Sequence, residues 1–320
     1  MNHPEGLGAV IVVAGEALID LVVSPGGQVD ARPGGGPYNA VRTMARLGAE
    51  TTFLGRLADD GFGRVLRDRL TEEGVALGVP ESSGKPSTLS VVSLDEAGVA
   101  AYTFYWEGTS APDLDYEAIK KAMPAGPTAV HVGTLRPAME PLGTAMERLV
   151  LTDVPADALV LLDPNYRPGG ATDHEAYRRR LHAMARRVDI VKASTEDLGY
   201  LYPGVPAEEA ARMVMRSGPP LVLITDGPHP ARAFLPDTVL VEEVPAVTIA
   251  DTIGAGDAFG GGFLAWWTAH GLGRADLGRP DLVRQALRAA VATSALTCTR
   301  PGADPPTLSE LKSRNWWPEA

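Results

Sequence analysis

Short apolar runs alternate with stretches of helical periodicity along most of the chain. Four runs are almost continuously apolar: 128–135, 158–165, 189–194 and 220–227. Helical spacing of apolar positions separates them at 141–151, 173–187 and 207–217. Near-continuous apolar strands that alternate with helices are typical of a parallel sheet buried on both faces. The pattern therefore predicts a three-layer α/β/α fold with a mostly parallel central sheet.

The N-terminal third begins with the same alternation. An apolar strand is predicted over 9–23, a helix from Pro37 to about Gly48, a strand over 51–57 and a helix over 62–74. Residues 20–33 and 87–108 differ, because apolar and polar positions alternate there around the turn sequences SPGG and DEAG. We expect these two segments to form a small β-sheet lid within one domain spanning 1–320. Residues 236–250 are predicted as a further strand.

Composition narrows the classes of function. The chain has 320 residues, of which 45% are hydrophobic, and a net charge of −11. That charge argues against a nucleic-acid partner, because phosphate backbones attract clustered Lys and Arg. The one cysteine, Cys298, cannot form an internal disulfide, which fits a cytoplasmic location. We expect no membrane span and no signal peptide, because Glu16 and Asp20 interrupt the apolar N-terminal stretch.

The sequence DTIGAGDAFGGGF, residues 251–263, carries the clearest chemical signal. The small residues at 254–256 leave backbone N–H groups uncovered at the start of an apolar helix, where the helix dipole favours an anion. Asp257 directly follows them and could accept a proton from a hydroxyl that attacks a bound phosphate. The alternative is that Asp257 caps the helix and the glycines allow close packing. Neither the P-loop pattern nor the G-x-G-x-x-G fingerprint is present.

Three segments together resemble the ribokinase-like (PfkB) carbohydrate kinases. They are DTIGAGDAFGGGF, GGGPYNAVRTMARLGAETTFLGRLADDGFG at 34–63 and TRPGADPP at 299–306. The resemblance covers almost the whole chain and implies ATP-dependent phosphorylation of a sugar. It implies that Asp257 is the catalytic base and that the amides of Gly254, Ala255 and Gly256 form the anion hole. It also implies a set of residues that bind sugar hydroxyls: Asp20, Gly35, Gly36 and Asn39. Taken singly, Asp20 could be a strand-end cap, Gly35 and Gly36 could be part of a turn, and Asn39 could be a solvated helix residue.

The same resemblance implies sites for nucleotide and metal. Nucleotide binding falls to Ser194, Thr225, Gly227, Gly254 and Gly256. In the family, an N-x-x-E motif holds the magnesium ion of the nucleotide. This chain has Ser194 at the Asn position and Asp197 at the Glu position, with Glu196 beside it. Either Glu196 or Asp197 could therefore be the magnesium residue. A potassium ion is implied beside the anion hole, held by the carboxylate or carbonyl groups of Asp251, Ile253, Thr297, Arg300 and Gly302. The alternative there is an ordinary C-terminal turn with Cys298 packed in the core.

Two further segments, LDPNYRP at 162–168 and AYTFYWEGTSAPD at 101–113, resemble the fructokinase and 2-keto-3-deoxygluconate kinase branch. They add Asn165, Phe104 and Trp106 as sugar contacts. Arg167 would bind phosphate or a substrate anion, or else form a surface salt bridge. Because deoxygluconate kinases often carry Arg at the position of Trp106, we expect a neutral sugar such as fructose, with 2-keto-3-deoxygluconate as the alternative. A non-catalytic sugar- or nucleotide-binding scaffold is the alternative of another class. An apolar outer face of the lid would favour a homodimer.

Overall fold

The computed structural model describes residues 10–94, 100–133, 139–166 and 174–320. Its large sheet has the strand order β13-β12-β11-β10-β9-β8-β1-β4-β5. Neighbouring strands from β11 to β5 pair in parallel, and β12 and β13 add an antiparallel edge. The strands are β1 (Val10–Ala14), β4 (Glu50–Leu54), β5 (Ala76–Leu77), β8 (Ala129–Gly133), β9 (Leu159–Asp163), β10 (Ile190–Ser194), β11 (Leu221–Asp226), β12 (His229–Phe234) and β13 (Val239–Glu242). The predicted α/β fold with a mostly parallel sheet is confirmed.

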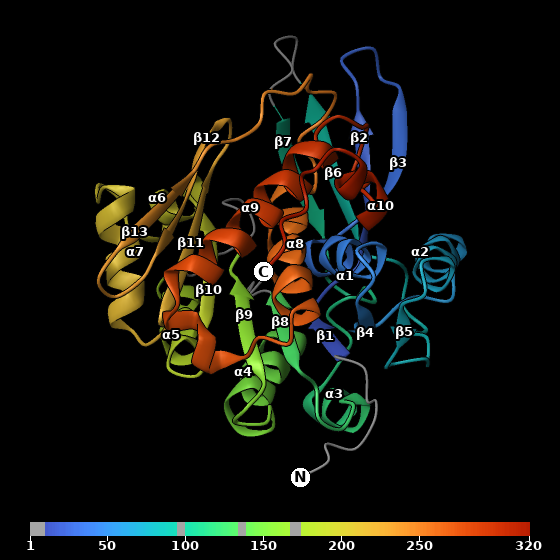
Figure 1. Ribbon diagram of the computed structural model, residues 1–320. Helices are drawn as coiled ribbons and strands as arrows, with labels where there is room; N and C mark the ends of the chain where they lie inside the picture. The colour runs from blue at the N-terminus through green and yellow to red at the C-terminus, as the bar shows by residue number, and fades with distance from the viewer. Residues whose placement is uncertain (1–9, 95–99, 134–138, 167–173) are drawn as a thin grey trace.

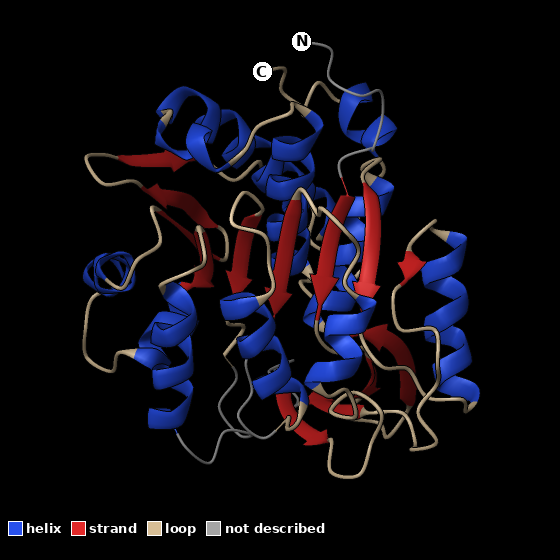
Figure 2. Ribbon diagram, turned by 90° about the horizontal axis from the view of Figure 1, so that it is seen from below, coloured by secondary structure: helices blue, strands red, loops and turns tan. Residues whose placement is uncertain are grey.

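Helices cover both faces of this sheet (Figure 2). Alternate residues of β1 belong to two different cores: Ile11 and Val13 pack on one face, and Val12 and Ala14 pack on the other. The first face is covered by α1 (Gly36–Arg46), α2 (Gly61–Glu72), α8 (Ala255–Ala269) and α9 (Pro280–Thr297). The second is covered by α3 (Tyr116–Ala122), α4 (Leu142–Thr152), α5 (His174–Ala185), α6 (Thr195–Leu201) and α7 (Ala207–Arg216). This double burial explains why the central strands are apolar at nearly every position.

The second sheet, which we call the lid sheet, consists of β2 (Leu18–Val23), β3 (Val29–Gly34), β6 (Leu89–Leu94) and β7 (Ala100–Tyr105) in the order β3-β2-β6-β7. Its strands lie together at one end of the α/β body (Figure 1). The two predicted lid segments therefore do form one small sheet. The single strand predicted over 9–23 is wrong, because β1 ends at Ala14 and the chain turns at Gly15 to enter the lid sheet as β2.

Other elements differ from the prediction in detail. Strand β13 covers only Val239–Glu242, and the rest of 236–250 has no strand assignment. The short elements α6 and β12 are missing from the prediction, because seven or six residues carry too little periodicity to recognise. Residues 274–278 form the 3-10 helix η1 (Arg274–Gly278), and α10 (Leu308–Ser313) follows α9. None of the helices within the described ranges has an apolar stretch long enough to cross a membrane.

Helix α8 is buried on all sides from Asp257 to Thr268. A helix that is apolar around its whole circumference must lie inside the protein. Here it packs in the same core as α1 and α9. This burial fixes the N-terminus of α8 at the carboxyl end of the sheet, where the chemistry of residues 254–257 is located.

Candidate active site

A cavity of about 1020 Å³ lies between the lid sheet and the carboxyl ends of the parallel strands. Most of the sequence-predicted site residues line it: Asp20, Gly35, Gly36, Asn39, Phe104, Trp106, Asn165, Ser194, Glu196, Asp197, Thr225, Gly227, Ile253, Gly254, Ala255, Gly256 and Asp257. Ligands of open α/β sheets bind in this position, outside the carboxyl ends of the strands. The fold thus brings segments from residue 20 to residue 257 to one cavity.

The N-terminus of α8 forms one wall of the cavity. Gly254 caps the helix with φ 76° and ψ 0°, a left-handed conformation that favours glycine. A Cβ atom on Gly254 would lie 2.5 Å from the Cβ of Ala303, so a larger residue would also clash. The Ala255 N–H donates to the Thr252 carbonyl at 3.2 Å and closes a turn. Among the three predicted amides, those of Gly254 and Gly256 are therefore better placed to meet an anion.

Asp257 is buried, with only 8% of its surface exposed, yet it lines the cavity. Its Oδ2 accepts a hydrogen bond of 2.9 Å from Nδ2 of Asn39, which projects from α1. A carboxylate held in one orientation by an amide is suited to accept a proton from a hydroxyl in the cavity. Gly254 occupies the N-cap position of α8 and Asp257 lies in the first turn, so Asp257 is not the N-cap residue of this helix.

Lys192 on β10 is a site residue that the sequence analysis missed. It is 4% exposed, and its Nζ lies 2.9 Å from Oδ2 of Asp163 at the end of β9. A Cβ on Gly256 would lie 2.8 Å from that Nζ, which places the ammonium group against the anion hole. Burial lowers the pKa of Lys192, but Asp163, Asp197 and Asp257 raise it further, so the net shift is upward and the group is charged. The sequence did contain a signal for this residue, namely a lysine within the apolar strand sequence DIVKAS. A buried lysine needs a charged or polar partner.

The lid side of the cavity carries acids. Asp20 on β2 faces inward, opposite Ser90 and Arg32 on the neighbouring strands. Burial raises the pKa of Asp20 to about 6, although Ser90 and Arg32 act in the opposite direction. Glu16, 4% exposed, lines the same region and was not predicted. The sequence signal for Glu16 was a single charged residue within an otherwise apolar segment between β1 and β2.

Three aromatic side chains of β7 and the residue after it line the cavity in a row. The ring centroids of Tyr102 and Phe104 are 6.1 Å apart, and those of Phe104 and Trp106 are 5.5 Å apart, in stacked geometry. Tyr105 points to the opposite face and is 56% exposed. The predicted alternation of Phe104 and Trp106 against Tyr105 is therefore observed. Tyr102 extends the apolar surface by one residue.

The far end of the cavity collects loops that follow β10 and β11. Ser194 and Asp197 form a capping box at the start of α6, with Asp197 buried and its Oδ2 2.7 Å from both Ser194 N and Oγ. Glu196 is exposed beside them and lines the cavity. Thr225 and Gly227 lie at the β11 turn. Unpredicted apolar residues close this end: Val244, Pro245, Ala246, Val247, Ala295 and Cys298.

Asn165 and Arg167 follow β9. Asn165 has φ 42°, an uncommon value for a residue other than glycine, and its N–H donates to Asp163 Oδ1 at 3.1 Å. Residues in this conformation cluster at functional sites, and Asn165 lines the cavity. Arg167 was predicted to bind phosphate or a substrate anion, but it lies outside the described residues.

Most of the residues expected to hold potassium do not line the cavity. Of that set, Ile253 lines the cavity, whereas Asp251, Thr297, Arg300 and Gly302 do not. Asp251 Oδ2 accepts from Arg32 Nη1 at 2.9 Å and from the Gly302 N–H at 2.8 Å. The Asp251 carboxylate is thus already paired with a cationic side chain.

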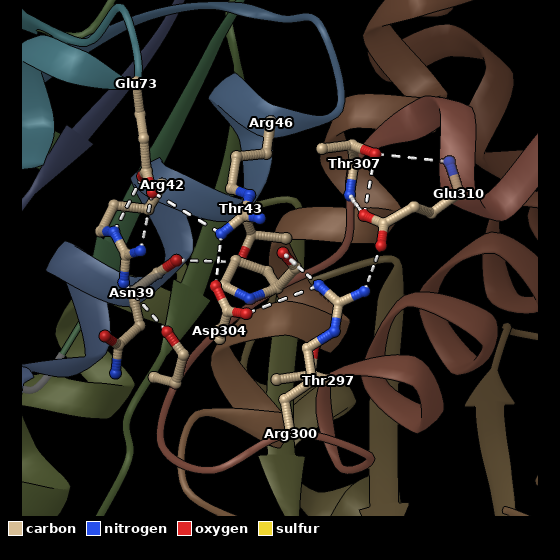
Figure 3. Close-up of polar contacts among 12 residues, drawn as sticks. Asn39, Arg42, Thr43, Arg46, Glu73, Thr297, Arg300, Asp304, Thr307 and Glu310 are labelled. Carbon is tan, nitrogen blue, oxygen red and sulfur yellow. Dashed lines mark hydrogen bonds and ion pairs between the residues drawn. The ribbon is translucent and has the colours of Figure 1, made fainter.

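A polar network ties α1 to the loop that carries Asp304 (Figure 3). Arg42, 2% exposed, binds both carboxylate oxygens of Glu73 at 2.7 and 2.8 Å and donates to the Ala303 carbonyl at 2.9 Å. Arg46 pairs with Asp304 at 2.5 Å. Ala303 contacts Gly254, and α1 carries Asn39, which binds Asp257. The network therefore fixes Asn39 and the N-terminus of α8 relative to each other.

Comparison with known proteins agrees with this geometry. A family model described as the pfkB family carbohydrate kinase matches residues 9–310. The chain belongs to this family. As a carbohydrate kinase it transfers a phosphoryl group to a sugar hydroxyl. It is 33% identical over 268 residues to a fructokinase of Rhizobium leguminosarum bv. trifolii, covering 80% of this chain and 79% of the relative.

Solved structures of fructokinases are similar over nearly the whole chain. A fructokinase from Xylella fastidiosa with bound ATP has a TM-score of 0.84 and 27% identity, covering 96% of this chain and 98% of that one. The Vibrio cholerae O395 fructokinase bound to fructose, ADP and calcium has a TM-score of 0.82 and 26% identity, covering 95% and 98%. A double mutant of the Vibrio protein, with fructose, ADP and potassium, has a TM-score of 0.83 and 26% identity, covering 95% and 97%.

Proposed function

We propose that this carbohydrate kinase transfers the γ-phosphoryl group of ATP to a hydroxyl of fructose. The observation that carries the proposal is the single cavity that joins Asp257, the α8 N-terminus and Lys192 to the acidic, aromatic lid side. The fructose- and ATP-bound fructokinases of the same fold support the substrate pair. We also propose a cytoplasmic location, where ATP is available as the phosphoryl donor.

The sugar binds on the lid side of the cavity. Asp20 and Asn39 hydrogen-bond its hydroxyls, Gly35 and Gly36 let it approach the backbone, and Phe104 and Trp106 cover its apolar face. Among the described residues that line the lid side of the cavity none is Lys or Arg, whereas Glu16 and Asp20 are acidic. Arg32, which lies opposite Asp20, is already paired with Asp30 and Asp251. A sugar acid would meet carboxylates there, so the geometry favours a neutral sugar over 2-keto-3-deoxygluconate.

Asp257 accepts the proton of the attacking hydroxyl, oriented by its hydrogen bond from Asn39. The negative charge that develops on the phosphoryl group is stabilised by the Gly254 and Gly256 amides and by the α8 dipole. Lys192, held against Gly256 by Asp163, supplies a fixed positive charge at the same point. Asn39 and Asp163 hold Asp257 and Lys192 in these positions, so little reorganisation is needed during transfer.

The nucleotide occupies the end near Thr225 and Gly227, with its base between residues 244–247 and Cys298. Magnesium neutralises charge between the β- and γ-phosphates when it is bound. Glu196 suits this ion better than Asp197, because Glu196 is exposed in the cavity and Asp197 is buried in the α6 capping box. Waters and phosphate oxygens complete the coordination of magnesium in sites with few protein ligands.

The whole chain from 1 to 320 is proposed to act as one domain, and the lid sheet is proposed to pair with a second copy. The face of the lid sheet away from the cavity carries exposed Val29 and Tyr105. Apolar side chains on an open sheet face are stabilised when another chain covers them. A homodimer would then form through the two lids.

A coupled ADP-release assay over fructose, 2-keto-3-deoxygluconate, ribose and nucleosides tests this function. We expect fructose to give the highest kcat/KM. A preference for 2-keto-3-deoxygluconate would overturn the assignment of a neutral sugar. No turnover on any of the sugars or nucleosides, with tight sugar binding retained, would favour the non-catalytic scaffold.

A further inference from the structure

The side chain of Arg32 lies where a cation beside Asp251 would be needed. Arg32 belongs to β3 of the lid sheet, directly opposite Asp20 and on the same face. Its Nη1 is 2.9 Å from Asp251 Oδ2, and its Nε is 2.6 Å from Asp30 Oδ2. The Asp251 side chain is 18% exposed, whereas that of Asp30 is 62% exposed. The contact with Asp251 is therefore the more buried of the two.

Two of the other groups expected to hold potassium already accept hydrogen bonds. The Thr297 carbonyl accepts the Arg300 N–H at 3.1 Å, and the Gly302 carbonyl accepts the Asp304 N–H at 2.9 Å. A Cβ on Gly302 would lie 3.6 Å from Arg32 Cδ, so the arginine side chain packs against that glycine. A monovalent ion needs several oxygens turned toward one point. The residues here do not fit that arrangement while Arg32 is present.

The Asp251 carboxylate connects two loops, and its negative charge needs a positive charge nearby. Its Oδ1 accepts the Ile253 N–H at 3.0 Å, directly before the anion hole, and its Oδ2 accepts the Gly302 N–H at 2.8 Å. One carboxylate thus joins the 251–254 loop to the 300–304 loop. A half-buried negative charge next to the anion hole would repel an incoming phosphate unless a positive charge neutralised it.

We propose that the Arg32 guanidinium is a built-in cation that replaces potassium at Asp251 and makes this kinase independent of monovalent cations. The inference rests on the proposed kinase function, but its main readout does not need turnover. Arg suits this role because it stays charged at every physiological pH and donates to two carboxylates at once. Being part of the chain, it also avoids the entropy lost when a free ion is bound.

The first test uses the unliganded wild-type protein. Chloride salts of potassium and of tetramethylammonium are exchanged at constant total salt while thermal unfolding is followed. We expect potassium to shift Tm by less than about 1 °C, because a ligand that does not bind the native state cannot stabilise it. Titration with thallium(I), observed by thallium NMR, should give no saturable signal from the protein. A saturable thallium signal or a potassium-specific rise in Tm would overturn the proposal.

The second test removes the built-in charge. Arg32→Gln should lower Tm and then recover several degrees in potassium but not in tetramethylammonium, and its kcat/KM should become at least about tenfold potassium-dependent. Arg46→Gln is the matched control, because Arg46 pairs with Asp304 of the same loop, away from Asp251, and it should remain insensitive to potassium. Arg32→Lys should also remain insensitive, and it serves if Arg32→Gln does not fold.

An Arg32→Gln variant that folds but ignores potassium in both assays would overturn the proposal, because Asp251 would then need no cation. A folded Arg32→Lys variant that becomes potassium-dependent would overturn it as well. Failure of the kinase assignment is separate: wild-type protein without activity on fructose would leave the thallium and Tm results unchanged.

Discussion

Replacing Asp20 by Asn should make the unliganded protein more stable while weakening sugar binding. Burial raises the pKa of Asp20 from 3.8 to about 6. A carboxyl group whose pKa is raised in the folded state favours folding below pH 4, and that advantage is lost as the pH rises through 6. Above pH 6 the ionised group therefore costs the folded state about 3 kcal/mol, from a shift of roughly two pKa units. Asn keeps the shape of the side chain and does not ionise.

The expected gain at pH 8 is about 3 kcal/mol, or roughly 4 °C in Tm for a chain of this length. It should shrink toward zero between pH 6 and pH 4, where wild-type Asp20 becomes neutral. Thermal or denaturant unfolding at pH 8 and pH 5 measures this difference. Asp30→Asn, an exposed carboxylate of the same strand pair, is the control and should change stability by less than about 1 kcal/mol. A stability gain that is the same at both pH values would refute the reasoning.

Sugar binding should change in the opposite direction. Sugar hydroxyls donate to the ionised carboxylate, so wild-type kcat/KM for fructose should fall as the pH drops below about 6. Loss of charge-assisted hydrogen bonds in Asp20→Asn should raise Kd for fructose by about 10- to 100-fold. Isothermal titration calorimetry measures the affinity, and the pH profile of the variant should lack the wild-type inflection. An unchanged affinity would remove Asp20 from the sugar site.

Four other outcomes are expected. Asp257→Asn should lower kcat about 10³-fold with fructose affinity nearly unchanged, and steady-state turnover close to wild type would exclude a base at this position. Lys192→Met combined with Asp163→Asn, which avoids a stranded carboxylate, should lower kcat at least about 100-fold, and unaltered kcat would show that Lys192 is only structural. Arg42→Met should cost about 3 kcal/mol in denaturant unfolding, because it removes two hydrogen bonds to the half-buried Glu73 carboxylate and one to the Ala303 carbonyl, and a loss under 1 kcal/mol would contradict the network. Tyr105→Asp should convert a dimer to monomers in sedimentation, and a wild type that is already monomeric at micromolar concentration would contradict lid pairing.

The sequence alone determined the local features of this protein. Apolar runs predicted the parallel sheet, because strands buried on both faces cannot alternate. The lid segments were visible in their period-two pattern, and uncovered amides next to Asp257 indicated an anion site at a helix start. Where local periodicity was short or interrupted, as at Gly15 between β1 and β2, the prediction merged two strands into one.

Only the tertiary structure decided which distant residues act together. Asn39 and Asp257 are 218 positions apart, and Arg32 and Asp251 are 219 apart. The role proposed for Lys192 depends on its closeness to Gly256, which only the folded chain shows. Such pairs leave no periodic trace, because contacts at the carboxyl ends of parallel strands depend on strand order and lid placement. The physical reason is that charge and hydrogen bonding are settled by distance in space, whereas sequence patterns record only neighbours along the chain.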